Sequence, residues 1–210
     1  MQNQLEADSA IFQINEDYRD CLQEISNVAM GQAGDKLARL LGAFVELSIP
    51  HIEIMTPSDI VMALHSIDAN ESVSGVCQGF IGGGISGEAM LLFNDTSFQD
   101  LANILRYEGD VDQQAERELL MDTTNVLFGA CLNGIAEQID MEFSFGPPMV
   151  LGQHLSVREL FQLDKARWNH ALVTEISYSI EGFNINCDLL IVMTEGSLEL
   201  LFKKLDYLLN

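Results

Sequence analysis

Basic residues are scarce in this sequence of 210 residues: 10 lysines and arginines stand against 32 acidic residues, and the formal net charge is −22. Binding to nucleic acids or to anionic membranes depends on clustered Lys and Arg, so we expect neither. An acidic surface favours solubility and a partner that presents basic groups. No apolar run approaches the roughly 20 residues that a membrane span requires, and the polar start of the chain does not resemble a signal peptide. We therefore expect a cytoplasmic protein.

Cysteine and histidine are also rare, with four of each. No two cysteines form a C-x2-C pair, and no cysteine has a histidine at metal-ligand spacing, so we expect reduced, buried thiols. The histidines are scattered, and we expect them to be structural or exposed rather than catalytic. No resident metal or other cofactor is predicted. These residues are Cys21, Cys77, Cys131 and Cys187, and His51, His65, His154 and His170.

A long helix is predicted from Asn15 to Gly42, and it carries a polar stripe. At about 100° per residue, Asp20, Glu24, Asn27 and Gly31 fall within about 60° of one another. Apolar residues gather on the opposite side and predict a face that packs on a core. That apolar set is Leu22, Ile25, Ala29, Ala33 and Leu40.

The same polar stripe returns near the middle of the chain with identical spacing, as Glu118, Asp122, Asn125 and Gly129. The pattern of helices and strands also repeats, with a period of about 98 residues, which is too long for a solenoid repeat. In the first half we predict extended segments over 43–50 and 51–55, a short helix over 57–65, a hairpin of 72–81 with 85–94, and a helix over 97–107. In the second half we predict a helix over 112–139, an interrupted extended segment over 141–151, a short helix over 157–163, a hairpin of 170–180 with 183–194, and a helix over 197–209.

Two half-domains related by a pseudo-twofold axis are the simplest assembly of this duplicated pattern. Hairpins dominate, so the predicted class is α+β, with one mainly antiparallel sheet shared by both halves and the two long motif-bearing helices side by side. We expect a tail over 1–14 and a single domain over 15–210, with halves at 15–110 and 111–210. Because the duplication resembles a dimer within one chain, we expect a monomer.

The motif residues resemble those of the CheC/CheX/FliY family of chemotaxis phosphatases. The family pattern is Asp or Ser, three residues, Glu, two residues, Asn, then 21 or 22 residues, and Pro. Asp20, Glu24, Asn27 and Pro50 fit it, with 22 residues between Asn27 and Pro50. Two copies of the motif, each followed by a correctly placed proline, make the sequence most similar to CheC.

In the second copy Asn125 and Pro147 fit the pattern, with 21 residues between them, but Glu118 and Asp122 depart from it. The resemblance implies hydrolysis of the phosphoaspartate of a CheY-type response regulator. It also implies possible stimulation by a partner, CheD. Any Mg²⁺ is expected to come with the receiver domain of the response regulator.

The chemistry of the motif residues agrees with this function. An asparagine amide carries a donor and an acceptor on one rigid plane, so Asn27 and Asn125 could orient a water molecule for attack on phosphorus. Glu24 lies one turn earlier. The resemblance implies a receiver domain with an active-site lysine, and Glu24 would form an ion pair with that lysine. Asp122 is one methylene shorter than Glu24, so the second site is the weaker prediction.

The other four residues of the stripes are expected to contact the partner. Asp20 and Glu118 would make peripheral contacts, and Gly31 and Gly129 would leave room for the partner's backbone.

Two alternative functions stay open. The chain could be a non-catalytic module that binds a response regulator or a flagellar-switch component, and Asp122 is the feature that favours this reading. It could also be a small-molecule enzyme with a pocket between the halves, which no motif locates. The run Gly82–Gly84 lacks the Lys-Ser/Thr of a phosphate-binding loop and is read as a hairpin turn.

Overall fold

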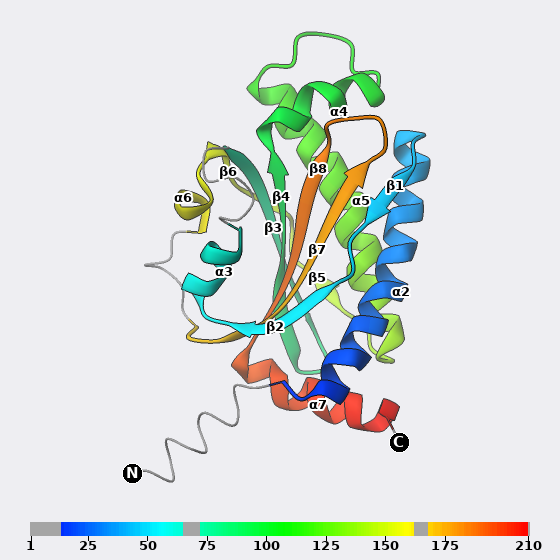
Figure 1. Ribbon diagram of the computed structural model, residues 1–210, viewed down its shortest axis with the longest axis vertical. Helices are drawn as coiled ribbons and strands as arrows, with labels where there is room; N and C mark the ends of the chain where they lie inside the picture. Colours follow the sequence, from blue (N-terminus) through cyan, green and yellow to red (C-terminus); the bar gives the residue numbers. More distant parts are fainter. Residues whose placement is uncertain (1–13, 65–71, 162–167, 210) are drawn as a thin grey trace.

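The computed structural model describes residues 14–64, 72–161 and 168–209 (Figure 1). The predicted tail lies outside this range except for Ile14, which is buried in the core. The position of His65 lies outside it as well.

The two halves contain the same helices and strands in the same order, as the repeat predicts, and the first half has an additional 3-10 turn. The first half comprises α2 (Glu16–Leu41), β1 (Val45–Leu47), β2 (His51–Met55), α3 (Pro57–Leu64), β3 (Val73–Gly82), β4 (Ile85–Asn94), the 3-10 turn Asp95–Ser97 and α4 (Phe98–Ile104). The second half comprises α5 (Gln113–Gln138), β5 (Ser144–Phe145), β6 (Met149–Leu155), α6 (Val157–Phe161), β7 (Ala171–Ile180), β8 (Asn186–Thr194) and α7 (Glu195–Leu209).

One antiparallel sheet of eight strands joins the halves. Its order is β1-β7-β8-β4-β3-β5, with β2 paired to β7 and β6 paired to β3. Exchanging each strand for its counterpart in the other half reverses this order without changing any pairing. The pseudo-twofold axis therefore passes between β4 and β8, and the predicted fold class and shared sheet are confirmed.

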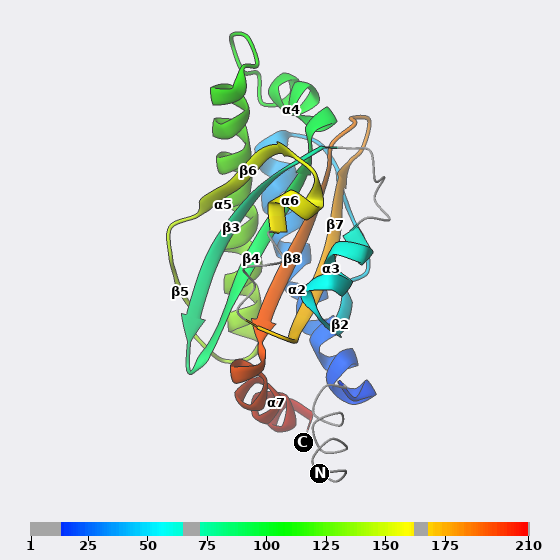
Figure 2. The same ribbon diagram turned by 90° about the vertical axis from the view of Figure 1, so that its left-hand side faces the viewer.

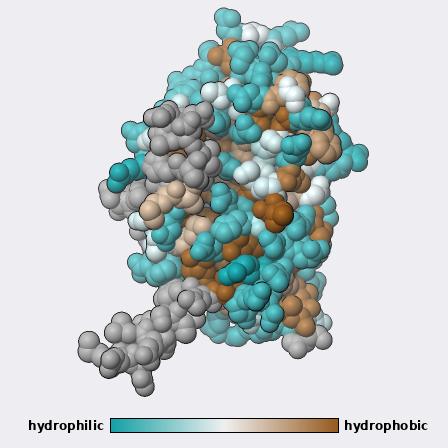
Figure 3. Space-filling view, in the orientation of Figure 1, coloured by the Kyte–Doolittle hydropathy of each residue, from teal (hydrophilic) through white to brown (hydrophobic). Residues whose placement is uncertain are grey.

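The molecule has three layers (Figures 1 and 2). The long helices α2 and α5 lie side by side on one face of the sheet, and the short helices α3 and α6 cover part of the other face. The larger core lies under α2 and α5, and a smaller one lies under α3 and α6. Figure 3 shows the molecule from the direction of Figure 1, with α3 and α6 toward the left and α2 toward the right, and this face is mostly hydrophilic with scattered hydrophobic areas.

Close backbone contact sets the distance between α2 and α5. A Cβ atom on Gly134 of α5 would stand 2.8 Å from the Cα atom and 2.9 Å from the Cβ atom of Ala29 on α2. Ala29 and Ala33 are fully buried. Small side chains at the crossing therefore allow two helices of 26 residues to pack closely on one sheet face.

Two local predictions are corrected. The helix predicted over 97–107 begins earlier, as the 3-10 turn, and ends at Ile104 because Arg106 takes a left-handed conformation with φ of 55°. On α2, Leu40 is 44% exposed, whereas Leu37 and Leu41 are buried. Leu37 and Leu41 therefore provide the apolar contacts in the last turns.

His154 contacts two carboxylates that are distant from it in the sequence. Its Nδ1 lies 3.0 Å from Oδ2 of Asp95, and its Nε2 lies 2.8 Å from Oε2 of Glu116. Burial disfavours the charged ring, but the two carboxylates outweigh this effect and raise the pKa of His154. The three residues come from β6, the turn after β4 and the first turns of α5, so their contacts connect the two halves.

Replacing Gly134 by alanine is expected to destabilise the protein by about 1–3 kcal/mol, because the new methyl group meets the backbone of Ala29. Gly129→Ala is the matched control on the same helix. A Cβ atom there has open space, so alanine should stabilise the helix by up to about 1 kcal/mol. Urea unfolding of both variants measures this, and equal effects would contradict the packing described.

His154→Asn is expected to lower the free energy of unfolding by an amount that depends on pH. Asparagine is chosen because it tolerates the φ of 55° at this position. The folded-state pKa of His154 is raised, so its charge stabilises the protein fully below the unfolded-state pKa of about 6.5. That stabilisation is lost as pH rises through the folded-state pKa. Urea unfolding should therefore show a difference between variant and wild type at mildly acidic pH that shrinks at alkaline pH, and a constant difference would refute this role.

Candidate functional site

The first polar stripe lies on the solvent side of α2. Asn15 caps the helix, accepting from the backbone N–H of Tyr18 at 2.7 Å, and Gly42 ends it in a left-handed conformation. Leu22, Ile25 and Ala29 face the core as predicted. The opposite side exposes its four motif residues, Asp20, Glu24, Asn27 and Gly31.

The polar groups of this stripe are available to a partner. Within the part of the chain that the structure describes, the side chains of Asp20, Glu24 and Asn27 make no hydrogen bond or ion pair. One helical turn separates Glu24 from Asn27, so a single partner surface can reach both. The stripe offers two carboxylates and one amide, a set that suits a cationic group beside a hydrogen-bonding group.

The second stripe is exposed on α5 in the same way. Glu118, Asp122 and Asn125 are exposed, and Gly129 is half-buried. Glu118 differs from Asp20 because its Oε1 accepts a hydrogen bond from Nε2 of Gln114 at 2.9 Å.

The two stripes lie at different heights along the helix pair. The helices run in opposite directions (Figure 1), and Gly134 stands opposite Ala29. At 1.5 Å per residue, Asn27 and Asn125 are therefore about 16 Å apart along the helix axes. The structure does not bring the two motifs together into one site, and each would have to act on its own.

The proline that follows each motif is held differently in the two halves. Pro50 is buried, and its carbonyl oxygen accepts a hydrogen bond of 2.8 Å from Nε2 of Gln23 on α2. Pro147 is exposed, and the residue before it, Gly146, is bonded to the sheet through Gln78 and Gly79. Sequence analysis missed Gln23 because its partner lies 27 residues away, and only the placed proline hinted at the contact.

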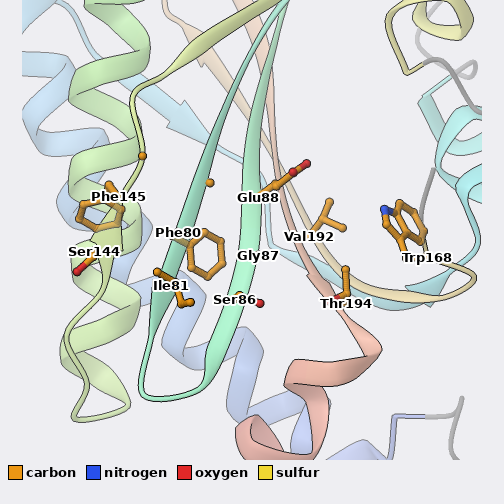
Figure 4. A pocket seen from close by; sticks show the side chains of 12 residues that line it. Phe80, Ile81, Ser86, Gly87, Glu88, Ser144, Phe145, Trp168, Val192 and Thr194 are labelled. Atoms are coloured by element: carbon orange, nitrogen blue, oxygen red, sulfur yellow. The ribbon is translucent and has the colours of Figure 1, made fainter. Parts of the chain in front are cut away.

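An apolar hollow of about 530 Å³ lies on the sheet face away from α2 and α5 (Figure 4). Residues of both halves line it, among them Ile81, Glu88, Phe145, Trp168 and Val192. Among the described residues that line the hollow, Glu88 is the one ionisable group, and these residues provide no acid–base pair or nucleophile–base pair. The motif residues of α2 and α5 do not reach it, and it therefore gives no support to a small-molecule enzyme.

Metal-binding groups do not converge in the described ranges, where no three His, Cys, Asp or Glu side chains come together as they would around an ion. The four cysteines are free thiols, and Cys77, Cys131 and Cys187 are buried. The helix α5 is long and apolar enough to cross a membrane, but 67% of its most apolar window is buried inside the protein. Core helices of this kind are common in proteins that do not cross membranes.

Comparisons with solved structures identify the fold. No family model matches the sequence. FliY of Thermotoga maritima superimposes with a TM-score of 0.67 at 16% identity, covering 92% of this chain and 98% of that one. The FliM middle domain of H. pylori gives 0.56 at 12% identity, covering 91% and 99%.

A chemotaxis protein CheX, from Desulfovibrio desulfuricans, gives a TM-score of 0.55 at 12% identity and covers 81% of this chain and 99% of that one. At these identities the likeness concerns the fold, and it extends over nearly the whole of each neighbour. The chain therefore has the CheC/CheX/FliY fold that its two motifs predict, a fold that the FliM middle domain shares.

Proposed function

We infer that this protein is a phosphatase that hydrolyses the phosphoaspartate of a CheY-type response regulator. The observation that carries this proposal is the exposed pair Glu24 and Asn27, which stand one turn apart on a helix packed firmly on the core. Neither side chain has a partner among the described residues, so both can be used in a complex. The fold, common to CheX and CheC-like proteins, supports the same conclusion.

The reaction requires little covalent chemistry from this chain. Water attacks phosphorus in line, the bond between phosphorus and the aspartyl oxygen breaks, and inorganic phosphate and a free aspartate carboxylate result. The Asn27 carboxamide would accept a hydrogen bond from the attacking water and hold it in line. The proton leaves to the phosphate product or to solvent. The receiver domain would supply Mg²⁺, which neutralises charge on the phosphoryl oxygens.

Glu24 would position the complex. Its carboxylate would form a charge-assisted hydrogen bond with the receiver's active-site lysine and hold α2 in register over the phosphoryl group. Asp20 lies one turn before Glu24 and would contact the edge of the receiver, while Gly31 leaves space for its backbone. Asp122, Asn125, Glu118 and Gly129 would play the same parts at the second site, with the shorter Asp122 carboxylate reaching less far.

A second candidate function is a non-catalytic module that binds a response regulator or a flagellar-switch component. The likeness to the FliM middle domain favours it. Glu24 and Asn27 would then be incidental to binding. CheD as a stimulating partner, a monomeric state and a cytoplasmic location all stay predictions.

Phosphate release from a phosphorylated CheY-type receiver in large excess tests the proposal. Wild type should turn over many receivers, and Asn27→Ala should lower the rate at least about tenfold, because a lost positioning group typically costs that much or more. Asn125→Ala should cost less than half of the rate, and the double variant should have no activity. Gln32→Ala, an exposed amide about 140° away on the same helix, is the matched control.

Three outcomes would count against this proposal. An Asn27→Ala variant that keeps most of the activity would reverse the ranking of the two sites. A wild-type protein that binds the receiver without turnover would move the function to the binding module. Absence of both turnover and binding would leave the likeness as one of fold alone.

A further inference from the structure

The segment between β1 and Pro50 in the first half is one residue longer than the segment between β5 and Pro147 in the second half. The backbone N–H of Ser48 donates to the carbonyl of Ser177 at 3.0 Å, and the N–H of Gly146 donates to the carbonyl of Gly79 at 2.9 Å. Each bond joins the residue after β1 or β5 to the neighbouring long strand, so Gly146 corresponds to Ser48. Pro147 follows Gly146 directly, and Ile49 therefore has no counterpart in the second half.

Two contacts hold this longer segment along α2. Leu47 packs on Gly34, where a Cβ atom would stand 3.0 Å from the leucine Cδ1. Pro50 accepts its hydrogen bond from Gln23, eleven residues earlier on the helix. Gln23 and Gly34 both lie within about 40° of Asn27 around the helix axis, so the segment follows the flank of the polar stripe.

Interpolation between these two contacts places Ile49 at about the height of Asn27 along the helix axis. The helix rises about 16 Å between Gln23 and Gly34. The backbone from Pro50 back to Leu47 is three residues long and spans about 10 Å, and the side chains of Gln23 and Leu47 bridge the remaining distance. The residue before Pro50, which is Ile49, therefore corresponds to a position about one third of the way from Gln23 to Gly34, close to Asn27. The Ile49 side chain is 76% exposed, so an apolar group stands in solvent at about the height of the Asn27 amide along α2.

We propose that Ile49 is an apolar docking contact for the receiver domain at the first site, held beside Asn27 by the bond between Gln23 and Pro50. This rests on the proposed function. Burial of an exposed isoleucine next to a carboxylate stripe suits a partner that presents a lysine with apolar surface around it. A second copy of this chain fits less well, because it would bring another acidic stripe and another −22 charge.

The second site lacks each part of this arrangement. Met121 stands where the first half has Gln23, at the repeat distance of 98 residues, and cannot donate a hydrogen bond to the linker. Gly146 offers no side chain, and Pro147 is exposed rather than held against the helix. Receiver docking should therefore be strong at Asn27 and weak at Asn125, independently of the shorter Asp122.

Ile49→Ala should weaken receiver binding about tenfold, since much of the apolar area buried by isoleucine would be lost. Titration with a beryllofluoride-activated CheY-type receiver measures the Kd. In phosphate release the half-saturating receiver concentration should rise by the same factor while kcat stays unchanged. Ile81→Ala is the matched control: Ile81 is 60% exposed and lines the hollow on the other face of the sheet.

Gln23→Met, which copies the second half, tests the positioning role. It should weaken binding several-fold in the wild-type background and have little further effect in the Ile49→Ala background, because both changes remove the same contact. Additive effects, or an Ile49→Ala variant that binds like wild type, would overturn the proposal. Thermal unfolding of each variant separates these effects from loss of fold.

The results distinguish this proposal from the phosphatase itself. Binding that depends on Ile49 without any turnover would retain the docking contact and reject the phosphatase. Turnover that depends on Asn27 but not on Ile49 would retain the phosphatase and reject the docking contact.

Discussion

Close packing of α2 against α5 is the constraint on which the rest of the structure depends. Gly134 and Ala29 meet at backbone distance, so the two helices share one face of the sheet without space between them. Their apolar sides are thereby committed to the core, and their motif sides must face solvent. The same crossing separates Asn27 from Asn125 along the axes, so the two polar stripes are separate and do not form one composite surface.

The two halves share the same strand pairings but differ in the segments that lie beside the two motifs. Every strand pairing has its counterpart across the axis between β4 and β8, whereas the segments beside the motifs differ. In the first half, Gln23 donates a hydrogen bond from the motif helix to Pro50, and Ile49 is exposed directly before that proline. In the second, the corresponding linker is one residue shorter, and its proline, Pro147, is exposed. The same frame therefore holds two motifs whose surroundings are different.

The sequence predicted the elements well because local signals mark their ends. Asn15 and Gly42 bound the first helix, and Gly83 and Gly84, both with positive φ, form the turn between β3 and β4. The repeat then predicted the shared sheet. Contacts between distant residues were missed, because no local spacing encodes them. The bond from Gln23 to Pro50 depends on how the linker crosses the helix.

The contacts of His154 with carboxylates from two other elements likewise depend on the completed fold. The predicted polar site residues lie on exposed faces of α2 and α5, as the helical spacing of each stripe indicated.

The most direct test of the central claim is a crystal structure of the protein bound to a beryllofluoride-activated CheY-type receiver. The account predicts that α2 lies over the phosphoryl position, with the Asn27 amide in hydrogen-bonding contact with a water in line with the aspartyl oxygen. It also predicts that Glu24 contacts the receiver's lysine. A complex in which the receiver docks elsewhere, with Asn27 exposed to solvent, would contradict the account.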